Sequence, residues 1–182
     1  ICLRKDGILI MVYSFSKDFA LKIRMGRWGG LFTRHGMELF LLRGYAGTGK
    51  TTLVGALVKT LTELNQSVVL MAPTGRAAKV FASYAEQPAY TIHKRIYRQK
   101  SITDTDTFSL NVNLSKHTLF IVDEASMIDL MLMNGLVNAI LPGSRFIIVG
   151  DDDQLPSVGA GNVLCDLIAS DRFATVRLTE IF

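Results

Sequence analysis

The chain has 182 residues, of which 49% are hydrophobic and 20% charged, a size and composition that suit one folded domain and exclude intrinsic disorder. No apolar run reaches the roughly 18–20 residues of a membrane-spanning helix, so we expect no membrane segment. The formal net charge is +4, but the charges are unevenly distributed. Residues 72–100 carry six basic side chains and one acidic side chain, whereas residues 101–182 carry four basic and eleven acidic side chains. The basic segment, and not the total charge, is therefore the candidate for a nucleic-acid contact.

Residues 1–36 contain several glycines that interrupt any long element, so we assign no fold to this segment. From residue 37 to residue 182, short apolar runs alternate with longer helical patterns, which predicts one α/β domain with a parallel sheet and helices on both faces. The predicted strands are 38–43, 67–72, 118–123, 145–150 and 175–179. The predicted helices are 50–64, 75–84, 91–98, 126–141 and 162–170, with a loop over 99–115. Cys2 and Cys165 form no metal-binding motif and fit a reduced, cytoplasmic setting.

The segment between the first predicted strand and helix matches the phosphate-loop pattern G-x-x-x-x-G-K-[ST]. Its glycines let backbone N–H groups surround a phosphate at the positive end of the following helix. We expect Lys50 to reach the β- and γ-phosphates of ATP and the Thr51 hydroxyl to bind Mg²⁺. A glycine-rich turn with a chance lysine is the alternative. The predicted nucleotide-binding residues are Gly44, Tyr45, Ala46, Gly47, Thr48, Gly49, Lys50, Thr51 and Thr52.

Two later strands also end in polar residues. Asp123 and Glu124 follow a buried strand, and we expect Asp123 to complete the Mg²⁺ shell and Glu124 to orient or deprotonate water. Residues 151–154 follow the next strand, so Gln154 is expected to face the γ-phosphate, and the middle acids to face water because they repel one another. The alternatives are a solvated turn in the first case and an acidic surface turn in the second.

Two further helix starts lie in the basic segment. Thr74 and Arg76 begin one helix, and Thr91 and His93 begin the next. A capped helix N-terminus with basic neighbours is suited to hold a phosphate. The alternative is a plain cap beside a solvated basic face, and a lone histidine such as His93 is more often structural than a ligand.

Six segments taken together resemble the first RecA-like domain of a superfamily 1 DNA helicase of the RecD-like type. They are GYAGTGKTT, APTGRAAK, TIHK, LFIVDEASMID, GDDDQLPSVGAGNVLCDLI and VRLTEIF, in this order between residues 38 and 182. The resemblance implies ATP hydrolysis that drives 5′-to-3′ movement on single-stranded DNA and duplex unwinding. Lys50, Asp123, Glu124 and Gln154 would then be catalytic. Thr74, Arg76, Thr91 and His93 would lie along the single strand.

The chain departs from that family pattern at two places. Residues 1–43 contain no glutamine that could read the adenine ring, and the sequence stops at Phe182, before the arginine expected next. The second RecA-like domain is absent as well, so we expect a fragment with weak or no activity of its own. Two other functions stay open: a kinase or signalling NTPase with a phosphate loop, and a non-catalytic module that binds ATP and nucleic acid.

Overall fold

The computed structural model describes residues 2–5, 8–11, 38–99, 108–110, 118–141, 143–155 and 157–179. Its main sheet has six strands in the order β10-β3-β9-β8-β4-β5, and every neighbouring pair is parallel. The strands are β3 (Glu38–Gly44), β4 (Val68–Ala72), β5 (Ala89–Thr91), β8 (Leu119–Val122), β9 (Arg145–Gly150) and β10 (Ala174–Leu178). The helices are α2 (Lys50–Glu63), α3 (Gly75–Ala85), α4 (Ile92–Ile96), α5 (Leu130–Asn138) and α6 (Val163–Ala169). The predicted α/β fold with a parallel sheet is therefore confirmed.

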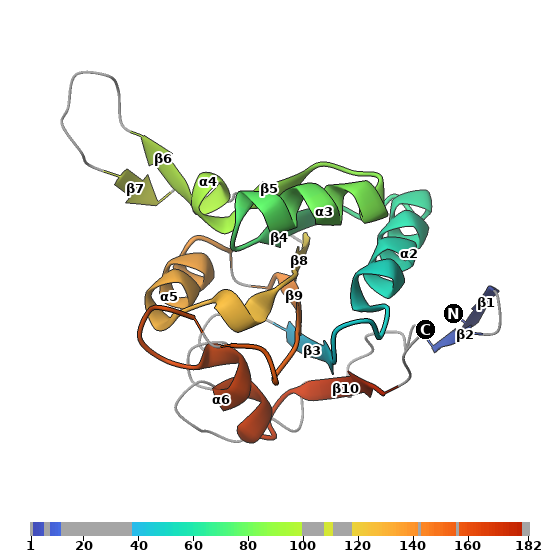
Figure 1. Cartoon of the computed structure of the whole chain (residues 1–182). Helices are drawn as coiled ribbons and strands as arrows, with labels where there is room; N and C mark the ends of the chain where they lie inside the picture. Colours follow the sequence, from blue (N-terminus) through green and yellow to red (C-terminus); the bar gives the residue numbers. More distant parts are fainter. Residues whose placement is uncertain are drawn as a thin grey trace.

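Helices cover both faces of this sheet, and the central strands are buried on both sides. In β8, Leu119 and Ile121 belong to the apolar cluster that contains residues of α2 and α3. The alternating residues Phe120 and Val122 belong to the cluster that contains residues of α5 and α6. Figure 1 shows the two pairs of helices on opposite sides of the sheet. This double burial explains why the strand is a continuous apolar run in the sequence.

Three short strands depart from the prediction. The helix predicted over 91–98 ends at Ile96, and β6 (Tyr97–Gln99) follows it directly. It pairs with β7 (Phe108–Leu110), which lies in the segment predicted to be a loop. Figure 1 shows β6 and β7 extending away from the sheet beyond α4. The edge strand β5 was not predicted either. Strands of three residues are too short to show a periodicity, so only their pairing partners identify them.

The helix predicted over 126–141 is in fact two elements. The 3₁₀ helix η2 (Ala125–Met127) comes first, and Asp129 then caps the separate helix α5, its Oδ1 accepting a hydrogen bond from the backbone N–H of Leu132 at 2.7 Å. Both elements are largely buried, so their apolar residues gave one continuous pattern in the sequence. Aspartate at a helix N-cap accepts hydrogen bonds from N–H groups that have no partner inside the helix. It therefore favours the start of a new helix at this position.

Outside the main sheet, β1 (Cys2–Lys5) and β2 (Ile8–Met11) form an antiparallel pair in the segment for which no fold was predicted. The five glycines of residues 1–36 lie outside the described residues. Within the described part of the chain, no helix has the length and apolar character needed to cross a membrane. The cytoplasmic setting stays a prediction.

Candidate active site

The loop between β3 and α2 contains positions that only glycine can occupy without strain. Gly47 and Gly49 have φ values of +82° and +73°, in the left-handed region that side chains disfavour. A Cβ atom on Gly44 would lie 2.9 Å from the backbone carbonyl oxygen of Leu178 on β10. The buried Thr48 closes the loop, because its hydroxyl and its N–H both donate to the carbonyl of Tyr45, at 2.8 and 3.3 Å. The tight loop predicted from the sequence pattern is thus present.

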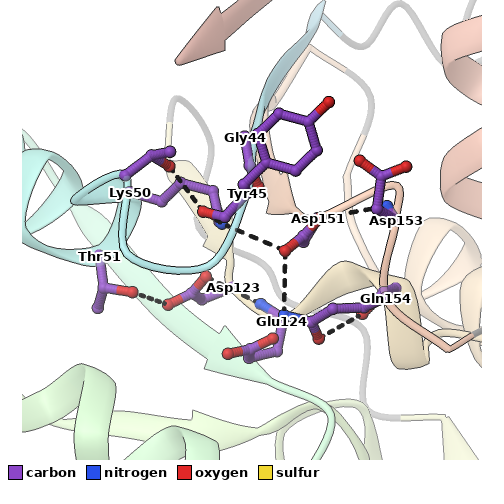
Figure 2. Close-up of polar contacts among 11 residues, drawn as sticks. Gly44, Tyr45, Lys50, Thr51, Asp123, Glu124, Asp151, Asp153 and Gln154 are labelled. Atoms are coloured by element: carbon purple, nitrogen blue, oxygen red, sulfur yellow. Dashed lines mark hydrogen bonds and ion pairs between the residues drawn. The ribbon is translucent and has the colours of Figure 1, made fainter. Parts of the chain in front are cut away.

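Lys50 begins α2, and its ammonium group lies across the loop. It donates to the carbonyl oxygens of Gly44 at 2.5 Å and Tyr45 at 2.7 Å. Its Nζ is also 3.9 Å from Oδ2 of Asp151, which comes directly after β9. Figure 2 shows this cation between the phosphate loop and the acidic residues at the ends of the neighbouring strands. The next residues of α2 differ from each other, since Thr51 turns toward the site and Thr52 is exposed.

Asp123 is a buried carboxylate directly after β8. Its Oδ2 accepts a hydrogen bond from the Thr51 hydroxyl at 3.0 Å, and its Oδ1 accepts one from the N–H of Glu124 at 2.9 Å. Burial raises the pKa of Asp123, although both hydrogen bonds and the charge of Lys50 oppose the increase. The two residues predicted to bind the metal, Thr51 and Asp123, are therefore in direct contact.

Glu124 is held in an unusual backbone conformation, with φ at +55° and ψ at +43°. Non-glycine residues in this region cost free energy and are concentrated at functional sites. Burial raises the pKa of its carboxyl group, and the neighbouring Asp123 and Asp151 raise it further, while Lys50 lowers it. A carboxyl group with a raised pKa is a better proton acceptor at neutral pH than an ordinary glutamate.

The residues after β9 form hydrogen bonds with one another and with Ser126 of η2. Oδ1 of the buried Asp151 accepts from the N–H of Asp153 at 3.1 Å, and its Oδ2 accepts from Nε2 of Gln154 at 3.4 Å. The Ser126 hydroxyl donates to Oε1 of Gln154 at 3.5 Å. Both ends of the exposed Gln154 amide are thus oriented toward the site (Figure 2).

The expectation that the middle acids face water holds for the exposed Asp153 and was wrong for Asp152. Asp152 forms a salt bridge with Arg43 of β3, with Nη1 and Oδ2 2.8 Å apart. This ion pair removes part of the repulsion among the three consecutive aspartates, and it attaches the loop after β9 to the strand that enters the phosphate loop. The sequence indicated this ion pair only by Arg43, a basic residue that follows four apolar residues of the strand.

The two basic helix starts have the predicted caps. The Thr74 hydroxyl accepts from the N–H of Ala77, and the Thr91 hydroxyl accepts from the N–H of Lys94, both at 3.2 Å. The side chains of Arg76 and His93 are exposed. This is the geometry of ordinary helix capping, and it leaves the side chains free to contact a ligand.

A cleft of about 760 Å³ brings one residue from each helix start together with Gln154. Thr74 and His93 line it, whereas Arg76 and Thr91 do not. Its other lining side chains include Asp129 and the exposed apolar residues Met131, Leu155 and Val158, which the sequence analysis did not single out. They come from segments far apart in the chain, so no local pattern could have grouped them.

Comparisons with known proteins agree with this architecture. A family model described as an AAA domain matches residues 31–182. The ATP-dependent RecD2 DNA helicase of Deinococcus radiodurans is 35% identical over 148 residues, covering 81% of this chain and 20% of that protein. The RecBCD enzyme subunit RecD of Mycobacterium tuberculosis is 34% identical over 151 residues, covering 70% and 26%. This chain thus spans only about a fifth to a quarter of these relatives.

Among solved structures, the chain is similar to the Pif1 helicase from Candida albicans, with a TM-score of 0.53 and 23% identity over 88% of this chain and 41% of that one. At this level of identity the likeness supports the fold alone. The resemblance predicted from the sequence motifs is confirmed by the family match and the two sequence relatives.

Proposed function

Because the chain belongs to the AAA domain family, we propose that residues 37–182 are the ATP-binding half of an ATP-driven DNA helicase. The observation that carries this proposal is the meeting of three strand ends at one edge of the sheet. Lys50 and Thr51 follow β3, Asp123 and Glu124 follow β8, and Gln154 follows β9. Ligands of open parallel sheets bind beyond the carboxyl ends of the strands, where these five residues lie.

In the proposed site, Lys50 exchanges the carbonyl oxygens of Gly44 and Tyr45 for the β- and γ-phosphate oxygens of ATP. The Thr51 hydroxyl and the Asp123 carboxylate are hard oxygen donors of the kind that Mg²⁺ prefers, so this pair fits the metal. When bound, Mg²⁺ would neutralise charge on the phosphates. The positive charge of bound Mg²⁺ would favour the ionised form of Asp123, which burial disfavours in the free protein.

Glu124 is the residue that we propose as general base. Its raised pKa increases its ability to accept a proton from the attacking water, and its carboxyl group lies next to the proposed metal ligand Asp123. Gln154 would contact the γ-phosphate. Because Gln154 also lines the cleft with Thr74 and His93, loss of the γ-phosphate would change the surface that faces the DNA strand. Gln154 would in this way couple ATP hydrolysis to movement along the DNA strand.

The rival functions differ in their response to DNA. A kinase or signalling NTPase would turn over ATP at a rate independent of single-stranded DNA, and a non-catalytic module would bind both ligands without turnover. The helicase proposal predicts turnover that single-stranded DNA increases. The cleft favours the helicase, because Gln154 of the proposed nucleotide site lines it together with Thr74 and His93 of the two helix starts.

The first test of the site is Lys50→Ala. Loss of a charge-assisted contact to a phosphate should cost about 1.5–3 kcal/mol, or about ten- to hundredfold in affinity. The measurement is a titration of labelled ATP in the presence of Mg²⁺. Lys59→Ala is the matched control, because Lys59 lies on the same helix but is paired with Glu86 at the surface. Equal affinities of wild type and Lys50→Ala would reject the site.

A further inference from the structure

Tyr45 places an exposed aromatic ring at the edge of the phosphate loop. Its backbone carbonyl accepts hydrogen bonds from Lys50 and Thr48, so the main chain of this residue belongs to the loop. Its side chain, in contrast, takes no part in shaping the loop and is 39% exposed. The residues that follow it, up to Lys50, are glycine, alanine or threonine. Tyr45 is thus the one aromatic residue of the loop.

Arg177 of β10 holds this ring. Its Nη2 donates to the Tyr45 hydroxyl, and its guanidinium carbon lies 5.0 Å from the ring centroid. The neighbouring residue Leu178 pairs with Gly44, so β10 runs directly beside the start of the loop. The cation over the ring and the hydrogen bond to its hydroxyl both restrict the ring, while Tyr45 stays 39% exposed.

The ring lies on the side of the loop opposite the catalytic acids. In the sheet, β10 and β9 are on opposite sides of β3, and β8 lies beyond β9. Figure 2 shows the Tyr45 ring pointing away from Asp123 and Glu124, with Lys50 between them. A triphosphate whose γ end faces Glu124 and Gln154 must extend its nucleoside end away from those residues. The Tyr45 ring is an exposed aromatic surface on that side of the loop.

We propose that the Tyr45 ring, positioned by Arg177, stacks on the base of the bound nucleoside triphosphate. The inference rests on the proposed phosphate site and adds how the rest of the nucleotide is held. Stacking on an aromatic side chain tolerates every base, because each base has a π face, and larger rings overlap more. The site is therefore expected to accept purine triphosphates generally, in agreement with the lack of a glutamine among residues 1–43.

The test compares ATP and GTP with inorganic tripolyphosphate, which keeps the phosphates and lacks the base. Each ligand competes with labelled ATP for residues 1–182 in the presence of Mg²⁺. The variants are Tyr45→Ala, Tyr45→Phe and, as a control, Tyr84→Ala, since Tyr84 is an exposed tyrosine on α3. Tyr45→Ala keeps the backbone carbonyl that the loop uses. The Lys50→Ala variant is measured beside them.

We expect Tyr45→Ala to weaken both purine nucleotides about five- to hundredfold, which corresponds to the loss of one base–aromatic stack. Tripolyphosphate should bind this variant as it binds the wild type, and Tyr45→Phe should keep most of the nucleotide affinity. Unchanged ATP affinity in Tyr45→Ala would overturn the proposal. So would equal weakening of ATP and tripolyphosphate, because the side chain would then act through the loop. Failure of Lys50→Ala to weaken either ligand would instead reject the phosphate site itself.

Discussion

Asp123 and Glu124 are neighbours in sequence, yet their surroundings differ and predict separate effects. Asp123 contacts Thr51, so Asp123→Ala should increase the Mg²⁺ concentration needed for tight ATP binding. Glu124→Gln keeps the size of the side chain and removes the base, so it should leave ATP binding almost intact. It should slow hydrolysis by about 10²–10⁴-fold, the usual contribution of a general base. Single-turnover phosphate release, with protein in excess of ATP, measures the second effect.

The control for both variants is Glu63→Gln, because Glu63 is an exposed carboxylate on α2. If Glu124→Gln hydrolysed ATP at the wild-type rate, the base would have to be another residue. A wild-type Mg²⁺ dependence in Asp123→Ala would remove Asp123 from the proposed metal site.

The buried charge of Asp123 should also lower the stability of the protein without nucleotide. Burial raises its pKa above the ordinary value of 3.8, so the folded state binds this proton more tightly than the unfolded state. The free energy of unfolding therefore falls as the pH rises from 3.8 through the raised pKa. Asp123→Asn removes the charge while its amide can still bond to Thr51 and Glu124.

We accordingly expect Asp123→Asn to be more stable than wild type at about pH 7, with a gain that disappears below about pH 4. Urea unfolding at several pH values is the measurement. Asp166→Asn, at an exposed position of α6, should show no such pH-dependent gain. A loss of stability in Asp123→Asn at neutral pH would show that its ionised form is favoured by the fold.

At the scale of elements, the starts of α3 and α4 present basic and polar side chains beside the cleft. Arg76 is exposed in the first turn of α3. If it contacts a DNA phosphate, Arg76→Ala should weaken the binding of unrelated single-stranded sequences equally and reduce the salt dependence by about one counterion. Titrations of labelled oligonucleotides at several salt concentrations measure both quantities.

Lys59→Ala is again a suitable control for charge alone, because it removes one positive charge from the opposite end of the α2–α3 pair, where Lys59 bonds to Glu86. A preference for one DNA sequence that disappears in Arg76→Ala would indicate contact with bases. That result would contradict a backbone contact, as would binding that does not change with salt.

At the scale of the whole molecule, the described arginines near the phosphate loop are engaged with other side chains. Among the described residues near the phosphate loop, Arg43 is paired with Asp152 and Arg177 is held against Tyr45. Phosphoryl transfer without an arginine on the γ-phosphate is slower by about 10³–10⁵-fold. We therefore expect residues 1–182 to bind Mg-ATP, to hydrolyse it slowly and not to separate DNA strands.

The measurement compares residues 1–182 with a longer protein of the RecD-like type that contains this domain, for phosphate release with and without single-stranded DNA and for strand separation. Movement along DNA needs two domains that close and open around the nucleotide, and the domain built on the main sheet is one of them. Equal rates from the two proteins would show that this domain acts alone and would reject the two-domain proposal.

The sequence by itself determined the central strands, the helices that cover them and the identity of the residues at the strand ends. These features follow from local rules: a doubly buried strand is a continuous apolar run, and a phosphate loop needs glycines at fixed spacing. The contact between Thr51 and Asp123 could also be anticipated, since both follow strands whose carboxyl ends lie at one edge of the sheet. The division of the segment after Glu124 into η2 and α5 could not, because both parts are buried and share one apolar pattern.

Tertiary structure alone decided which distant side chains meet. Arg43 and Asp152 are 109 positions apart, and Tyr45 and Arg177 are 132 apart, so no periodicity or motif connects them. Both pairs depend on the strand order, which places β9 and β10 on the two sides of β3. The same order assembles the cleft that joins Gln154 to Thr74 and His93. Local patterns fix each element, whereas the neighbours of an element are set by the packing free energy of the whole chain, and that is why these contacts required the structure.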